Sequence, residues 1–168
     1  MNNIFETTYD CNGRSIITNT MGREMQMRIY KKYASQYLLL KAPPASGKSR
    51  ALMFVALEKL RTGLVKKVIV AVPERSIGKS FASTKLTENG FHTDWVVSRR
   101  YDLCTPGGEP MKTAAFAGFM DDNNEQILLC THSTLRFAYE KIGKGKFNDC
   151  LLAIDEFHHV SAEADSKL

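Results

Sequence analysis

The stretch that decides the fold reads Ala42-Pro43-Pro44-Ala45-Ser46-Gly47-Lys48-Ser49. It matches the pattern of a phosphate-binding loop except at its first position, where alanine replaces glycine. A strand-like apolar run precedes it at residues 37–41, and a helix-like run follows it over residues 49–60. In that context backbone N–H groups and a helix N-terminus converge and stabilise the negative charge of a polyphosphate. We therefore expect a phosphate site at this loop.

The side chains of the loop add to its backbone. Lys48 supplies a mobile positive charge, and Ser49 offers a hydroxyl to Mg²⁺, which prefers hard oxygen ligands. A helix N-terminus that carries Gly-Lys-Ser by chance is the alternative, which the flanking strand and helix disfavour. The residues expected to hold the nucleotide phosphates and the ion are Pro44, Ala45, Ser46, Gly47, Lys48, Ser49 and Arg50.

Composition restricts the class of protein. The 168 residues suit one domain with a real core. No apolar stretch reaches membrane-spanning length and no signal pattern opens the chain, so we expect a cytoplasmic protein without a membrane partner. The net charge of +5 is compatible with an anionic partner but does not by itself indicate one. The four cysteines contain no Cys-x-x-Cys pair, so neither a zinc site nor a disulfide framework is indicated.

Short apolar runs alternate with helical segments along the chain. The runs occupy residues 37–41, 67–72, 95–97, 126–130 and 150–154, and most are continuously apolar, as in strands covered on both faces. This alternation predicts an α/β fold, a mostly parallel sheet with helices on both faces. Gly63 is expected to end the first of these helices in a left-handed cap. Residues 99–112, which include Pro106-Gly107-Gly108, are predicted to form a surface loop.

A second motif follows the last apolar run, where Asp155 and Glu156 are adjacent. Ligands of open α/β sheets bind at the carboxyl ends of the strands. Neighbouring residues there point in different directions, so Asp155 can hold Mg²⁺ while Glu156 activates a water in line with the terminal phosphate. An acidic pair that merely opens a solvated loop is the alternative. The candidate catalytic residues are Lys48, Asp155 and Glu156.

Together, residues 42–49 and Asp155-Glu156-Phe157-His158 resemble the first ATPase domain of superfamily 2 helicases and translocases. The resemblance is to the DExH branch, near the helicase subunits of type III restriction enzymes. It implies a RecA-like P-loop NTPase fold that uses ATP and Mg²⁺, with Ser49 and Asp155 at the metal. Residues 23–26 resemble the R-x-x-Q element of the family, which implies that the amide of Gln26 reads the adenine edge. His158, the fourth letter of its motif, would link the nucleotide site to the partner domain.

Two further turns resemble motifs that contact the nucleic-acid backbone in that family. They lie at residues 70–75, like motif Ia, and 131–135, like the T-x-x-x-L motif. Each ends a strand and opens a helix, so each offers N–H groups and hydroxyls to phosphate, although ordinary helix capping is the alternative. Isolated aromatic residues at 95, 101 and 116 could stack on bases but are more often core in α/β domains. The implied nucleic-acid contacts are Pro73, Arg75, Ser76, Thr131 and Ser133.

The resemblance covers about residues 20–160. It implies an N-terminal extension over residues 1–20 and a helicase ATP-binding domain over 21–168 that stops before motif III. The expected function is ATP binding and hydrolysis in a nucleic-acid-dependent helicase or translocase, with DNA favoured over RNA. A second RecA-like domain would be the partner in the full-length protein, and this chain alone should have little turnover.

Two other functions stay open on the sequence. One is a non-catalytic nucleic-acid-binding or assembly module with a degenerate nucleotide site, which the alanine at position 42 permits. The other is a small-molecule phosphotransferase, which Gln26 and the two backbone-contact motifs disfavour.

Overall fold

The computed structural model describes residues 4–8, 17–19 and 22–157. These residues form two compact units. The first contains the described residues up to Leu64 together with Ser83–Trp95, and the second contains Val65–Ala82 together with the described residues from Val96 onward. None of the helices within residues 22–157 is both long and apolar enough to cross a lipid bilayer.

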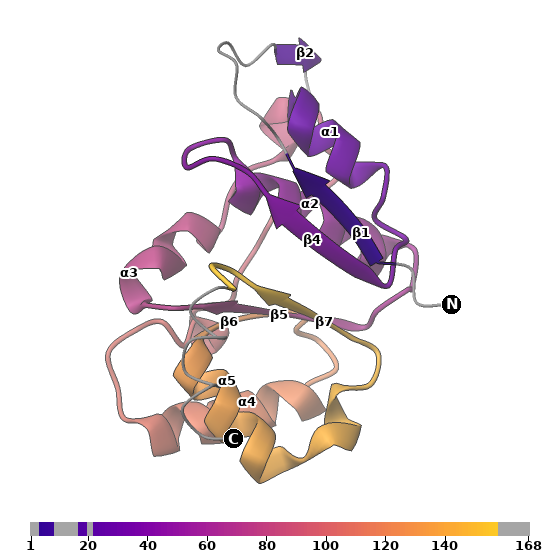
Figure 1. The fold of residues 1–168 in the computed structure, drawn as a ribbon. Helices are drawn as coiled ribbons and strands as arrows, with labels where there is room; N and C mark the ends of the chain where they lie inside the picture. The colour runs from indigo at the N-terminus through magenta and orange to yellow at the C-terminus, as the bar shows by residue number, and fades with distance from the viewer. Residues whose placement is uncertain (1–3, 9–16, 20–21, 158–168) are drawn as a thin grey trace. The chain divides into compact units, whose positions relative to one another are not determined.

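In the first unit, strand β1 (Ile4–Thr8) pairs in parallel with β4 (Tyr37–Lys41), and the two lie side by side in Figure 1. A short antiparallel pair, β2 (Ile17–Asn19) and β3 (Gly22–Arg23), precedes helix α1 (Glu24–Tyr30). Helix α2 spans Lys48–Arg61. The strand predicted at 37–41 is therefore confirmed, whereas the strand at residues 4–8 was not predicted.

One buried cluster of the first unit lies between α1, α2 and one face of β4. Its buried residues are Met25, Ile29, Ala51 and Val55, and Leu38 and Leu40 of β4 pack against them. The side chains of Tyr37 and Leu39 alternate with these leucines and are exposed. The expectation that continuous apolar strands are covered on both faces is thus wrong for β4, because the helical cluster covers only the leucine face that carries residues 38 and 40.

Helix α2 ends as the sequence predicts. Gly63 has φ 71°, in the left-handed region that glycine adopts without strain. Its N–H donates to the Leu60 carbonyl at 3.1 Å, and the Leu64 N–H donates to the Lys59 carbonyl at 3.0 Å. These two bonds form a Schellman motif, which satisfies carbonyls that the helix end would otherwise leave without donors.

The segment Ser83–Trp95 completes the first unit. Thr84 and Trp95 close it through reciprocal backbone hydrogen bonds of 2.8 and 3.0 Å. The Phe91 ring stacks on that of Phe54 in α2, with centroids 4.6 Å apart. The predicted strand at 95–97 is wrong, because Trp95 forms an isolated bridge with Thr84 and its fully buried side chain serves as core. A 3-10 turn at Thr87–Asn89 shapes the middle of the segment.

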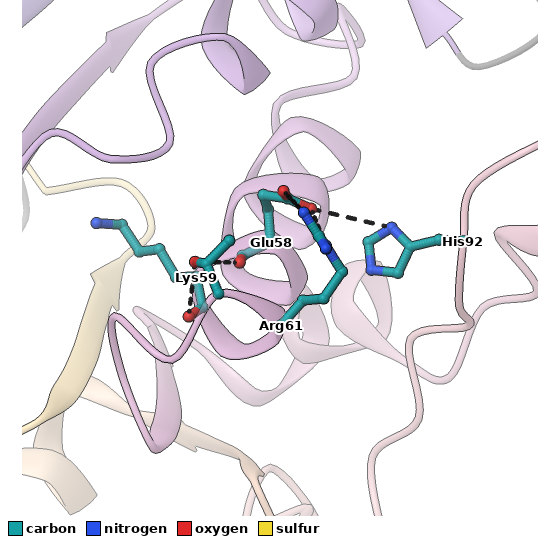
Figure 2. A network of polar contacts seen from close by, with 5 residues as sticks. Glu58, Lys59, Arg61 and His92 are labelled. Carbon is teal, nitrogen blue, oxygen red and sulfur yellow. Dashed lines mark hydrogen bonds and ion pairs between the residues drawn. The ribbon is translucent and has the colours of Figure 1, made fainter.

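A buried carboxylate ties this segment to α2 (Figure 2). Glu58 is 3% exposed, and its two oxygens accept from Arg61 Nη2 at 2.6 Å and Nε at 3.0 Å. His92 Nδ1, from the segment, lies 4.0 Å from Glu58 Oε2. The hydrogen bonds from Arg61 lower the pKa of Glu58. Neighbouring Lys59 extends away from this group and donates to the Ser35 carbonyl at 2.9 Å.

The second unit contains a three-stranded parallel sheet in the order β6-β5-β7. Its strands are β5 (Lys67–Val72), β6 (Ile127–Thr131) and β7 (Cys150–Ile154). The predicted α/β class and parallel pairing are confirmed, and the runs at 67–72 and 150–154 have the predicted bounds. The run predicted at 126–130 begins and ends one residue later.

Helices α4 (Glu109–Asp121) and α5 (His132–Ile142) lie on the same side of this sheet in Figure 1. Short helical elements complete the unit: α3 (Arg75–Gly78), η1 (Lys79–Phe81), η3 (Arg99–Tyr101) and η4 (Lys144–Phe147). The core pairs strand residues with helix residues, and its members are Ile69, Ala71, Tyr101, Leu103, Phe116, Phe119, Leu128, Cys130 and Ala138.

The predicted surface loop at 99–112 is wrong at both ends. Tyr101 and Leu103 are buried, and the Leu103 N–H donates to the Leu129 carbonyl of β6 at 2.8 Å. Helix α4 already begins at Glu109. Apolar side chains thus hold the first half of the segment in the core, despite the breakers at 106–108. Trp95, Tyr101 and Phe116 are all buried, which fits their interpretation as core aromatics.

Candidate functional site

The predicted phosphate loop connects β4 to α2 in the first unit. Two of its residues have left-handed backbone, Ala45 with φ 59° and Gly47 with φ 93°. A Cβ on Gly47 would lie 2.3 Å from Gln26 Nε2, so a side chain there would strain the backbone and displace the Gln26 amide. Alanine in the left-handed region costs about 1–2 kcal/mol, and such strain is typical of backbone held for binding. The loop is therefore bent into a defined shape just before the N-terminus of α2.

One polar atom of the loop fits a phosphate ligand. Ser46 Oγ is buried and has no hydrogen-bond partner among the residues that the structure describes. A buried hydroxyl without a partner costs about 1–3 kcal/mol, which a bound oxyanion would offset. Lys48 and Ser49 are half-buried in the first turn of α2, where the helix dipole favours negative charge. The ammonium and hydroxyl donors gathered here suit a polyphosphate.

Gln26 and Arg23 hold the phosphate loop from α1. Gln26 is 3% exposed, its Nε2 donates to the Gly47 carbonyl at 3.1 Å, and its Oε1 accepts from the Arg23 N–H at 2.8 Å. Arg23 Nη1 donates to the Ala45 carbonyl at 2.6 Å. The resemblance to the R-x-x-Q element implies that Gln26 reads the adenine, and it assigns no role to Arg23. In the sequence, the only sign of these contacts is the spacing of three residues between Arg23 and Gln26, which is also the spacing of a helix capping box.

The predicted acidic pair lies at the end of β7 in the second unit. The Asp155 N–H donates to the Ala71 carbonyl at 2.9 Å, which extends the β5–β7 ladder one residue past the strand. Glu156 has φ 51°, a left-handed conformation that is uncommon for a non-glycine residue. The chain therefore leaves the extended conformation between the two carboxylates, and their different roles stay a prediction. Both residues are half-buried.

The turn after β5 carries the first predicted nucleic-acid contacts. Arg75 and Ser76 are exposed, as is Lys79 after the end of α3. The Ser76 hydroxyl donates to a Glu74 carboxylate oxygen at 3.3 Å. This acidic neighbour, which the sequence analysis did not consider, reduces the net positive charge of the turn.

The turn after β6 carries the other predicted contacts. Thr131 is the N-cap of α5, and its buried Oγ1 accepts from the Thr134 N–H at 3.3 Å. The same oxygen lies 2.9 Å from Ser133 Oγ and 3.0 Å from Thr134 Oγ1. Thr134 in turn donates to Glu109 Oε2 at 2.9 Å. The capping alternative thus describes the Thr131 side chain, while Ser133 is exposed beside it.

The register places these turns of the second unit along one edge of the sheet. Val72 pairs with Thr131, and Ala71 pairs with Ile154, so the residues that follow all three strands leave from the same carboxyl edge. His132, the first residue of α5, lies 3.0 Å from the Asp155 carbonyl oxygen through its Nε2. This contact was not predicted, because its two residues are 23 positions apart and no local pattern indicates it.

The predicted residues are divided between the two units. The phosphate loop and Gln26 belong to the first unit, and the acidic pair and the two nucleic-acid turns belong to the second. His158, the predicted coupling residue, lies outside the described residues. The loop fits a phosphate, and the hydroxyl of Ser49 and the carboxylate of Asp155 are hard oxygen ligands of the kind that Mg²⁺ takes.

The family model for DEAD/DEAH box helicases matches residues 23–167. A Bacillus subtilis (strain 168) protein named "Putative ATP-dependent helicase YeeB" is 57% identical over 169 residues. The match covers 100% of this chain and 28% of that protein, so the chain spans less than a third of the relative's length. No solved structure matches.

Proposed function

The chain belongs to the DEAD/DEAH box helicase family, and we propose that it binds and hydrolyses ATP to drive movement on nucleic acid in the full-length protein. The observation that carries the proposal is the phosphate loop. Its left-handed Gly47 and its buried Ser46 hydroxyl, which has no hydrogen-bond partner in the described part of the chain, suit an oxyanion at the start of α2. The relative's name specifies an ATP-dependent helicase, which agrees with this choice.

In the proposed reaction, the first turn of α2 and Lys48 hold the phosphates of ATP. Ser49 and Asp155 would hold Mg²⁺, which when bound neutralises phosphate charge as the terminal phosphoryl group leaves. Glu156 accepts a proton from a water molecule whose oxygen attacks the terminal phosphorus. The bond between that phosphorus and the bridging oxygen breaks, leaving ADP and inorganic phosphate. Gln26 would also read the adenine edge.

The nucleic-acid partner is proposed to bind at the two turns that follow β5 and β6. Pro73, Arg75 and Ser76 lie at one turn, and Thr131 and Ser133 lie at the other, on adjacent parallel strands. Such groups contact phosphates and carry no sequence information. We favour DNA over RNA as the partner. A second RecA-like domain of the full-length protein would complete the machinery, with His158 linking the nucleotide site to it.

Hydrolysis of ATP by the full-length protein, measured with and without single-stranded DNA or RNA, tests this proposal. The rate should rise on adding polynucleotide. Glu156→Gln should lower the stimulated rate by about 10²–10⁴ fold, because an amide cannot accept the proton. The matched control is Glu140→Gln, an exposed carboxylate on α5, which should leave the rate unchanged.

Indifference to both polynucleotides, together with no binding at low salt, would contradict the proposal. That result would point to the phosphotransferase or assembly alternatives.

A further inference from the structure

His132 lies between two parts of the proposed machinery in the second unit. It is the first residue of α5, directly after Thr131 at the predicted nucleic-acid turn. Its Nε2 lies 3.0 Å from the main-chain carbonyl oxygen of Asp155. A carbonyl oxygen can only accept, so Nε2 must carry the proton and donate. The imidazole ring therefore joins the start of α5 to the end of β7.

The Asp155 backbone is held on both sides. Its N–H donates to the Ala71 carbonyl at 2.9 Å, and its C=O accepts from His132. The carbonyl belongs to the peptide plane that leads into Glu156, whose φ of 51° is left-handed. Because this conformation is costly, contacts around it must maintain it. The hydrogen bond from His132 is one such contact, and it fixes the plane from which the Glu156 side chain departs.

The other end of the connection is the hydroxyl cluster at the N-terminus of α5. Thr131 Oγ1 lies within 3.0 Å of the hydroxyls of Ser133 and Thr134, and the latter donates to Glu109. A phosphate that engages exposed Ser133 would act on the same cap that positions His132. A shift of the first turn of α5 would reach Asp155 through one hydrogen bond, with no flexible linker in between.

We propose that His132 is a positioning residue that couples nucleic-acid binding at the β6–α5 turn to the orientation of Glu156. This inference rests on the proposed function, because it assumes that Glu156 activates the water and that the turn holds a nucleic-acid backbone. The coupling is reciprocal in binding: polynucleotide that favours one orientation of the turn is itself bound more tightly when the nucleotide site favours that orientation.

The test compares His132→Phe with His132→Gln in the full-length protein. Phenylalanine keeps a planar ring but removes the donor, whereas glutamine restores an N–H donor of similar reach. For each protein, kcat and KM for ATP are measured without and with saturating single-stranded DNA, and DNA affinity is measured by fluorescence anisotropy. Glu140→Ala, exposed on α5, is the control for changes to the helix itself.

We expect His132→Phe to reduce the stimulation of kcat by DNA about tenfold, within the usual range of coupling between sites. KM for ATP without DNA and the affinity for DNA without nucleotide should stay close to those of the wild type, and His132→Gln should recover most of the stimulation. A His132→Phe protein that is stimulated as strongly as the wild type would overturn the inference alone. A loss of DNA affinity in His132→Phe that His132→Gln does not restore would also overturn the inference. A wild-type protein that polynucleotide does not stimulate would overturn the proposed function, and the coupling role with it.

Discussion

At the scale of single residues, the phosphate loop is shaped by contacts from outside its own motif. Gly47 is confined by Gln26, whose amide nitrogen occupies the space that a Cβ would need. Arg23 fixes the carbonyl of Ala45, the residue with the strained backbone. Two side chains of the α1 region thus hold the loop in shape before a nucleotide contributes, which lowers the ordering cost of binding.

Lys112 offers a test of burial at the residue scale. It is 4% exposed, and its Nζ has no hydrogen-bond partner among the described residues. A buried charge without partners is costly, so Lys112→Met, which keeps the apolar stem, should raise the free energy of unfolding by about 1 kcal/mol or more. Urea unfolding of the chain, followed by the fluorescence of its one tryptophan, measures this change.

Lys144→Met, at an exposed position, is the matched control and should change stability by less than about 0.5 kcal/mol. A Lys112→Met protein that is clearly less stable than the wild type would show that the ammonium makes a favourable interaction in the folded chain.

The sequence predicts part of this residue-scale picture. The loop, the acidic pair and the cap at Gly63 follow from local spacing, because each depends on neighbouring backbone. The bonds from Gln26 to Gly47 and from His132 to Asp155 join residues 21 and 23 positions apart. Such contacts depend on how elements pack, and no local pattern encodes them. The roles of Gln26 toward adenine and of Thr131 toward phosphate stay predictions.

At the scale of elements, strand position was predictable where the apolar run was long and continuous, as in β5 and β7. The run at 95–97 was too short to form a ladder, and Trp95 serves the core instead. Strand β1 escaped prediction because Ile4-Phe5-Glu6-Thr7-Thr8 contains only two apolar residues. The nearby breakers at 106–108 predicted a loop over residues 99–103, but Tyr101 and Leu103 are buried in the core.

The network around Glu58 predicts a dependence of stability on pH. Hydrogen bonds from Arg61 lower the pKa of Glu58 below its ordinary value of 4.5, with His92 and the Tyr30 hydroxyl as further neighbours. A lowered carboxyl pKa contributes stability that is present above the unfolded-state value and is lost as the pH falls through the folded-state value. Glu58→Gln should therefore destabilise the chain most near neutral pH, and the difference from the wild type should shrink under acidic conditions below 4.5.

The fluorescence of Trp95 is a suitable probe of this loss of stability, because Trp95 is buried in the segment that His92 helps to attach to α2. Urea unfolding at about pH 7 and about pH 4, read by tryptophan fluorescence, gives the two differences. Glu140→Gln is the exposed control. If the effect of Glu58→Gln is equal at both pH values, the charge of the Glu58 carboxylate does not help to hold the segment.

At the scale of the whole molecule, the order of the chain does not follow the order of its units. The chain enters the second unit at Val65, returns to the first for Ser83–Trp95, and then re-enters the second. The strand–helix alternation predicted the α/β class but not this return, because it depends on tertiary contacts such as Phe91 on Phe54. The loop and the acidic pair, 107 positions apart from Lys48 to Asp155, fall in different units as a result.

Residues 42–49 are proposed to bind the phosphates of ATP, and isothermal titration calorimetry of ATP with Mg²⁺ measures this binding. The full-length wild-type protein should bind, and Lys48→Ala should lose most of that affinity, because charge-assisted contacts to phosphate are among the stronger hydrogen bonds. Lys144→Ala, exposed in η4, is the control and should bind as the wild type does. A folded Lys48→Ala protein that binds ATP with unchanged affinity would show that this loop does not hold the phosphates.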